Sequence, residues 1–417
     1  MVENQTPDVR MRGFSRRETV AAAWNWIDAN SEPLPEEQSG LAGAAGRVLA
    51  QDVLSTVDVP GFDRSAMDGY AVRSEETVAA GEYNALRFRV VGESLPGRPC
   101  GVPVERGEAV RIMTGAPIPP GADAVVPAEY ARTTPDQDQV DLTQPVSAYK
   151  NVGRCGEDIQ AGSIVLPAGR KLRPQDVAVV ASVGLAELNL IRRPRVRILV
   201  TGDELAQPGT SKGPFQIYES NSAMLRELVL RDGAMLESLQ FLADNRTRIR
   251  EGITADGADV ILVSGGSSVG AEDHAPTVVA ETGELAIHGI AMRPSSPAGF
   301  GRVKSSLVFL LPGNPVSCLC AYDFFAGRAI RRQGGRQGTW PYIETRGTLT
   351  RKIASAVGRV DYCRVRFAGG EVEPLALSGA SILSSTTRAD GFVVIDGPSE
   401  GFAAGSEVTV LLYDAAN

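Results

Sequence analysis

Residues 260–270 read VILVSGGSSVG, a short apolar run that leads directly into a loop of serine and glycine. Such a run, bounded by glycine, is typical of a strand that is buried on both faces of a sheet. Similar runs at residues 196–200 and 307–311 lead into TGDE and PGNP, and helical patterns lie between them, as at residues 221–231. This alternation predicts a doubly wound α/β domain over residues 193–335, with its ligand at the carboxyl ends of the strands.

The sequence on either side of this domain predicts further domains. Short β-type runs separated by glycine and proline indicate a small β domain at residues 57–149, inserted into an N-terminal domain made of residues 1–56 and 150–192. Residues 336–417 alternate as short strands and fit a C-terminal β barrel or sandwich. We therefore expect a multidomain α/β protein.

Two helices are expected in residues 1–56, and a third is expected after Pro174 in the second segment of the N-terminal domain. Ser15 and Glu18 have the spacing of a capping box, which predicts a helix that runs to about Ala29. A second helix is predicted over residues 41–49.

Length and charge narrow the possible functions. The chain has 417 residues, enough for two or three domains, and its 42 basic against 50 acidic residues give a net charge of −8. That charge repels polyanions, so we expect no nucleic-acid partner. No apolar run approaches the roughly 20 residues of a membrane span, so no membrane association and a cytoplasmic location are expected.

Cysteine and histidine usage excludes several kinds of site. The five cysteines are spread along the chain without CxxC spacing, so neither a disulfide framework nor a structural zinc site is indicated. With only two histidines, a multi-histidine metal site is excluded. Any metal would be held by carboxylates.

The loop at residues 264–270 is a candidate anion site. Its glycines allow the backbone to approach a ligand, and its N–H and hydroxyl groups suit a phosphate. A tight strand-to-helix turn is the alternative, and the interleaved serines favour binding. The candidate residues are Ser264, Gly265, Gly266, Ser267, Ser268 and Gly270.

Glu204, Asp244 and Asp273 each follow a predicted strand of the same domain. Their loops would gather on one edge of the sheet, where carboxylates together with phosphate oxygens and water could hold Mg²⁺. Each acid taken alone is more often a helix cap or a solvated loop residue. The metal hypothesis therefore depends on their convergence.

Two polar, turn-rich segments remain, at residues 60–73 and 111–125. Neither has an amphipathic period, and loops of this kind tend to carry function. In the first segment, a β-turn at Asp68-Gly69 is the structural alternative, and it could coexist with a functional role. In the second segment, the residue types alone point only to the exposed hydroxyl of Thr114.

These segments resemble the molybdopterin molybdenumtransferases of molybdenum-cofactor biosynthesis, the MoeA family, and the related gephyrin E domain. The matching motifs occur in the family's order along essentially the whole chain: PGFDRSAMDGYAVR, RIMTGAPIPPGADAVV, GEDIQAG, TGDEL, IYESNS, SGGSSVG and LPGNPVS. The resemblance implies insertion of molybdenum from molybdate into adenylylated molybdopterin, with release of AMP and a need for Mg²⁺. It also implies an elongated homodimer whose site is shared between subunits, with possible transient contact to the molybdopterin adenylyltransferase.

The resemblance also implies roles for individual residues. The family's catalytic acids match Asp68, Asp158, Glu204, Asp244 and Asp273, and its threonine matches Thr114. Molybdopterin would be bound by the serine and glycine loop above together with Arg293, Pro312, Gly313 and Asn314.

The chain departs from the family pattern on the side implied to bind molybdate. Where the family reads KPGKP, residues 293–297 read RPSSP, so the first lysine is Arg293 and the second is replaced by Ser296. A further family lysine corresponds to Pro276. We expect weaker, more salt-sensitive molybdate binding, unless Arg64, Arg302 or Lys304 compensates.

Three hypotheses follow from these residues. The first is the molybdenum-inserting enzyme. The second is a non-catalytic paralogue that binds or delivers molybdopterin or the finished cofactor, and the missing lysines favour it. The third, a scaffold like gephyrin, lacks support because the sequence shows no fused partner domain.

Overall fold

The structure is a computed structural model of the chain and describes residues 17–266 and 273–414. It consists of two compact units. One contains the residues up to Glu37, residues 46–48 and the chain from Leu190 onward, and the other contains residues 38–45 and 49–189. The boundaries between the units fall within β1 (Glu36–Gly40) and β12 (Glu187–Ile191) and on either side of residues 46–48.

The larger unit contains the predicted α/β domain, which is built on a six-stranded sheet. Four neighbouring strands run parallel, the fifth is antiparallel to them, and the sixth pairs antiparallel with the fifth and so runs in the direction of the first four. The order across the sheet is β16 (Met235–Leu242), β13 (Arg195–Thr201), β17 (Val260–Ser264), β21 (Ser306–Leu311), β20 (Gly299–Val303) and β18 (Glu284–His288). Strands β17 and β21 are buried along their whole length, which explains their unbroken apolar sequence.

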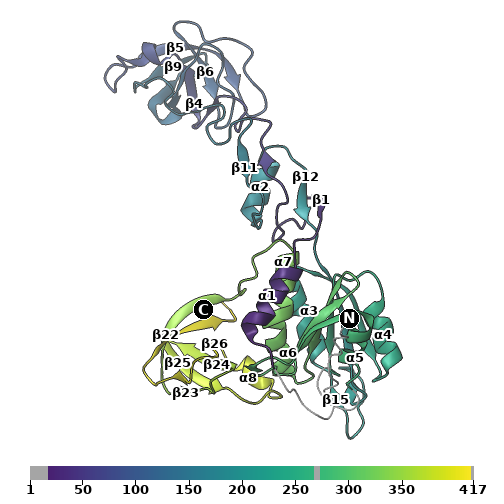
Figure 1. The fold of residues 1–417 in the computed structure, drawn as a ribbon. Helices are drawn as coiled ribbons and strands as arrows, with labels where there is room; N and C mark the ends of the chain where they lie inside the picture. Colours follow the sequence, from purple (N-terminus) through teal and green to yellow (C-terminus); the bar gives the residue numbers. More distant parts are fainter. Residues whose placement is uncertain (1–16, 267–272, 415–417) are drawn as a thin grey trace. The chain divides into compact units, whose positions relative to one another are not determined.

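Helices cover both faces of this sheet (Figure 1). Successive residues of β13 point to opposite faces, so Ile198 and Leu199 belong to different core clusters. The Ile198 face packs against α1 (Val20–Asn30), α3 (Asn221–Arg231), α6 (Pro315–Ala321) and α7 (Gly327–Gln333), and a π-helical turn (Tyr322–Ala326) joins α6 to α7. The Leu199 face packs against α4 (Arg246–Thr254) and α5 (Ala275–Thr282).

The C-terminal region of the larger unit is a closed five-stranded β barrel. Its strands follow the order β24 (Val360–Ala368), β25 (Glu371–Ala376), β22 (Ile343–Leu349), β28 (Glu407–Leu412) and β26 (Gly391–Ile395). Strand β26 also pairs with β24 and so closes the ring. The short β19 (Met292–Arg293) pairs with β24 and ties the barrel to the α/β domain. The smaller elements are β23 (Ile353–Ala354), β27 (Gly401–Phe402) and α8 (Ser384–Thr387).

The smaller unit is built around its own six-stranded sheet. The order is β7 (Ala124–Pro127), β4 (Gly69–Val72), β6 (Glu108–Ile112), β5 (Leu86–Ser94), β9 (Gln139–Leu142) and β8 (Ala131–Thr133). Short pairs join β3 (Arg64–Ser65) to β10 (Val152–Gly153) and β2 (Val53–Leu54) to β11 (Ile164–Leu166), and α2 spans Pro174–Ser182.

The N-terminal segment has one of the two predicted helices. The helix predicted over residues 41–49 is wrong: these residues form turns, because Gly43 and Gly46 take positive φ angles of 76° and 82°. Helix α1 begins after Thr19, whose Oγ1 accepts from the Ala22 N–H at 3.1 Å, whereas the expected cap Ser15 lies outside the described residues. The division of the whole chain into four domains remains a proposal.

Candidate functional site

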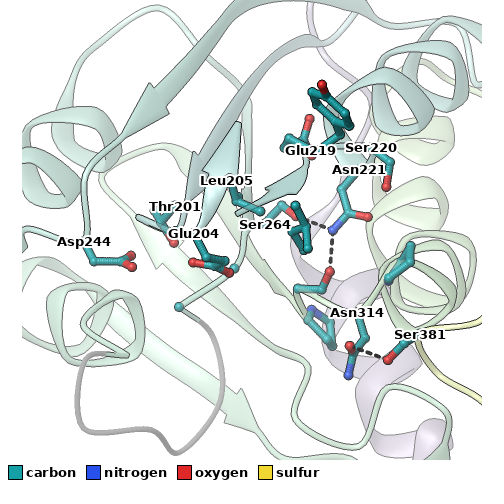
Figure 2. A pocket seen from close by; sticks show the side chains of 18 of the residues that line it. Thr201, Glu204, Leu205, Glu219, Ser220, Asn221, Asp244, Ser264, Asn314 and Ser381 are labelled. Carbon is teal, nitrogen blue, oxygen red and sulfur yellow. Dashed lines mark hydrogen bonds between the residues drawn. The ribbon is translucent and has the colours of Figure 1, made fainter. Parts of the chain in front are cut away.

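A cavity of about 860 Å³, here called the strand-end cavity, opens at the carboxyl ends of the parallel strands. The loops after β13, β16, β17 and β21 all contribute residues to its wall (Figure 2). This is the position at which open α/β sheets bind their ligands. The convergence of the three predicted loops is therefore present in the structure.

The serine and glycine loop lies directly against the end of β13. A Cβ atom on Gly265 would meet the Thr201 carbonyl oxygen at 2.3 Å, and the φ of Gly265 is +92°. Gly266 also has a positive φ, of 55°. Only glycine fits this close approach, and both glycines line the cavity. Ser267, Ser268 and Gly270 lie outside the described residues.

Asn221, at the start of α3, connects two of the loops. Its Nδ2 donates to Ser264 Oγ at 3.0 Å and to the Gly313 carbonyl oxygen at 2.8 Å (Figure 2). Because a carbonyl oxygen can only accept, the Gly313 bond fixes which way the amide faces. Ser381 from the barrel region donates to Asn314 Oδ1 at 2.8 Å. Neither Asn221 nor Ser381 was predicted as a site residue, and Asn221 stands out in the sequence only as part of the matched motif IYESNS.

The three predicted metal ligands Glu204, Asp244 and Asp273 all line the strand-end cavity. Glu204 is exposed and the other two are partly buried. Figure 2 shows the carboxylates of Glu204 and Asp244 on the same side of the cavity. Within residues 17–266 and 273–414, however, no three acidic, histidine or cysteine side chains lie close enough together to hold a metal ion by themselves. A cation here would need further oxygen ligands, such as those of a phosphate.

A second cavity of about 770 Å³, here called the arginine cavity, shares Pro297, Pro312 and Asn314 with the first. Three arginines, a run of serines and part of the barrel line its wall. The arginines are Arg17, Arg293 and Arg359.

One buried carboxylate organises two of these arginines. Asp361 is fully buried, and its Oδ2 accepts from Arg293 Nη2 at 2.7 Å while its Oδ1 accepts from Arg359 Nε at 3.0 Å. Ser355 Oγ also donates to Asp361 Oδ2, at 2.9 Å. The carboxylate neutralises one of the two charges and holds both planar groups in place.

The remaining predicted site residues lie in the smaller unit. Asp68 and Thr114 are brought together: Asp68 Oδ1 accepts from both the N–H and the Oγ1 of Thr114, each at 2.7 Å. These two bonds, first the backbone one and then the hydroxyl one, lower the pKa of the Asp68 carboxyl. Asp158 is exposed on a separate turn, where its N–H donates to the Val59 carbonyl oxygen at 3.1 Å.

Three regions of the chain match family models in order. They are the "MoeA N-terminal region (domain I and II)" at residues 18–184, the "Probable molybdopterin binding domain" at residues 197–332 and the "MoeA C-terminal region (domain IV)" at residues 346–413. A molybdopterin molybdenumtransferase from Haemophilus influenzae is 33% identical over 91% of this chain and 94% of its own length. The chain belongs to the molybdopterin molybdenumtransferase family.

Other relatives agree with this assignment. Molybdopterin molybdenumtransferase 2 from Mycobacterium tuberculosis is 38% identical over 78% of this chain and 81% of its own length. The crystal structure of a molybdopterin biosynthesis MoeA protein from Pyrococcus horikoshii covers 95% of this chain and 100% of its own, with a TM-score of 0.79 and 30% identity. The predicted fold class, the transferase assignment and a place in molybdenum cofactor biosynthesis are thus confirmed.

The structure also shows what surrounds the positions that depart from the family pattern. Two expected substitutes for the missing lysines bind elsewhere: Arg302 donates to Asn30 Oδ1 at 3.0 Å, and Lys304 donates to Asp256 at 2.7 Å. Arg64 lies in the smaller unit, 3.9 Å from Glu157. Arg359, which lies in the wall of the arginine cavity with Arg293, was not predicted as a site residue, because the two arginines are far apart along the chain.

A buried thiol lies next to the first residue of the serine and glycine loop. Cys318 on α6 is fully buried, with its Sγ 4.0 Å from Ser264 Oγ. Burial raises the pKa of this thiol to about 12. Cys318 therefore stays protonated at neutral pH and serves as a packing residue.

Among the described helices, none has the length and apolarity required to span a bilayer.

Proposed function

We propose that this family member inserts molybdenum from molybdate into adenylylated molybdopterin and releases AMP. The observation that carries the proposal is the pair of adjoining cavities, one lined by acids and the serine and glycine loop, the other by arginines. In the reaction, the two sulfurs of the dithiol displace two oxygens of molybdate. The two thiol protons and two protons from solvent convert these oxygens to two molecules of water. Water cleaves the phosphoanhydride bond, so AMP leaves and the phosphate stays on molybdopterin.

The strand-end cavity would bind the phosphoanhydride. The Gly265 N–H already donates to the Leu311 carbonyl oxygen at 3.2 Å, so phosphate oxygens would bind at the N–H of Gly266, which also lines the cavity. The Asn221 amide holds this loop against the Pro312-Gly313 loop. Asn221 therefore positions Ser264 and Gly313 before the ligand arrives, so that binding does not have to order these two residues.

Glu204, Asp244 and Asp273 provide the oxygen donors that Mg²⁺ prefers. Since these residues do not form a complete ligand set, one or two of them would bind the ion together with phosphate oxygens and water. When bound, the ion would supply positive charge beside the phosphoanhydride.

The arginine cavity would receive molybdate. Arg17, Arg293 and Arg359 carry the positive charge that a dianion needs in a chain of net charge −8. Because Asp361 neutralises part of that positive charge, the attraction of molybdate to this cavity would depend on the net charge of the three arginines and Asp361 together.

We further propose a cytoplasmic homodimer in which Asp68, Thr114 and Asp158 of one subunit face the α/β domain of its partner. The exposed Asp68–Thr114 pair supports this, because its carboxylate is held in one orientation at the surface. Sedimentation as a monomer at micromolar concentration would argue against the dimer. Transient contact with the molybdopterin adenylyltransferase is part of the same proposal.

The deciding experiment incubates the purified chain with adenylylated molybdopterin, Mg²⁺ and molybdate, and measures AMP by chromatography. We expect AMP to be released only when both Mg²⁺ and molybdate are present. The alternative is a protein that binds or delivers molybdopterin without catalysis, which Ser296 and Pro276 in place of lysine favour. Tight binding of adenylylated molybdopterin without AMP release would establish that alternative.

A further inference from the structure

The strand-end cavity has one aromatic side chain among the described residues of its wall, that of Tyr218. Tyr218 lies on β15 (Ile217–Tyr218), which pairs in parallel with β14 (Leu205–Ala206). The Ile217 N–H donates to the Glu204 carbonyl oxygen at 2.9 Å, so this short ribbon is joined to the backbone of a proposed metal ligand. Tyr218 is therefore held on the same wall as Glu204.

The Tyr218 ring is both accessible and fixed. The residue is 49% exposed, and its hydroxyl donates to the Thr210 carbonyl oxygen at 3.0 Å. This bond restrains the ring and leaves its position set in the absence of ligand. Its neighbour Ile217, which also lines the cavity, is 59% exposed. Both residues line the cavity, and Tyr218 supplies the flat aromatic face among its described lining residues.

The proposed substrate has two chemically different ends. Its phosphoanhydride suits the backbone N–H groups and carboxylates, but its flat bicyclic pterin needs an apolar or aromatic face. Stacking of a flat heteroaromatic ring on an aromatic side chain contributes about 1–3 kcal/mol of binding free energy, and it does not depend strongly on the substituents of the ring. The Ser264, Asn221 and Asn314 side of the cavity offers polar groups, whereas the Tyr218 side offers such a face.

We infer that Tyr218 binds the pterin ring of the substrate by stacking, an inference that rests on the proposed function. The serine and glycine loop then holds the phosphate end, and the position of the ring decides how the molecule lies across the cavity. Tyr218 is a substrate-binding residue in this scheme and takes no part in proton transfer.

The test uses two separate probes, 6-hydroxymethylpterin for the ring and AMP for the phosphate end. Pterin binding is followed by quenching of the probe's fluorescence, and AMP binding by calorimetry. The variants are Tyr218→Ala, Tyr218→Leu and Tyr218→Phe. Phe215→Ala is the matched control, because Phe215 lies in the turn just before β15, is 93% exposed and is not among the residues that line the cavity.

We expect Tyr218→Ala and Tyr218→Leu to bind the pterin about tenfold more weakly, and Tyr218→Phe and Phe215→Ala to stay within about twofold of wild type. AMP affinity should be the same in all five proteins. The Leu and Phe variants keep the apolar bulk, so they decide the matter if the Ala variant folds poorly.

Equal pterin affinity in Tyr218→Leu and wild type would overturn the inference and leave the proposed function intact. So would a Phe variant as weak as the Leu variant, since the hydroxyl bond to Thr210 would then be what matters. Failure of the wild type to bind either probe would count against the proposed function itself, and the inference would fall with it.

Discussion

Asp68 and Thr114 are joined through a single oxygen: Asp68 Oδ1 accepts from the backbone N–H and from the hydroxyl of Thr114, both at 2.7 Å. Both donors favour the ionised carboxylate, so they lower its pKa, and the backbone bond contributes more. The pair presents an oriented negative charge on a turn-rich loop.

Thr114→Ala should raise the pKa of Asp68 partway toward its ordinary value, because the hydroxyl bond is lost and the backbone bond remains. Thr114→Ser should leave the pKa low. A lowered folded-state pKa contributes stability above the ordinary aspartate pKa of about 3.9, and this contribution is lost as pH falls through the folded-state value. Carboxyl-carbon NMR titration of the three proteins measures the effect, and identical titration curves would show that the hydroxyl bond is not formed in solution.

Glu204→Gln or Asp273→Asn should reduce Mg²⁺-dependent AMP release by about 100-fold or more, since each removes a negative charge beside the phosphoanhydride. Both side chains lie in loops, so melting temperatures should change little. Glu251→Gln on α4 removes an exposed carboxylate that pairs with Arg248 and serves as the control. Wild-type turnover in either cavity variant would show that the carboxylate and metal scheme is wrong.

Gly265→Ala should destabilise the protein by roughly 3 kcal/mol, because both the positive φ and the approach to Thr201 oppose a side chain. Gly209→Ala is a matched control: its φ is +85°, but no atom lies within 4 Å of the added Cβ. That variant should lose only about 1 kcal/mol, from backbone strain alone. Urea denaturation compares the two, and equal losses would mean that the loop can move away from β13.

Ser296→Lys should lower the molybdate concentration needed for half-maximal cofactor formation by about fivefold, or about 1 kcal/mol, because it adds a cation to the arginine cavity. Added salt should reduce the gain. Ser305→Lys adds the same charge next to the start of β21, at the opposite end of the sheet, and should have little effect. If Ser296→Lys also has no effect, Arg17 and Arg359 already supply enough charge.

Asp361→Asn should lower the free energy of unfolding by about 2 kcal/mol, because Arg293 and Arg359 lose their shared buried carboxylate. Both arginines are partly exposed to solvent, which keeps the loss from being larger. Asp256→Asn breaks the exposed pair with Lys304 and should leave the urea midpoint almost unchanged. Equal midpoints for the two variants would show that the buried carboxylate contributes little to stability.

The α/β domain and the convergence of its loops at the carboxyl ends of the strands could be predicted from sequence, because parallel core strands are apolar throughout and end in distinctive loops. The helix predicted at residues 41–49 failed because left-handed glycines interrupt it, and composition does not reveal φ. Arg359 and Asp361 escaped notice for another reason. They reach Arg293 only through the pairing of β19 with the barrel strand β24, and no spacing in the sequence encodes that contact.

The burial of Cys318 has a consequence for a substrate that carries its own pair of sulfurs. A thiolate beside the dithiolene could form a mixed disulfide with it or compete for the incoming molybdenum. Among the described residues that line the two cavities there is no cysteine, and the thiol behind Ser264 is fully buried with its pKa raised to about 12. In the proposed reaction, these described residues would therefore offer oxygen and nitrogen groups to the metal, and the dithiolene would be the only soft ligand within its reach.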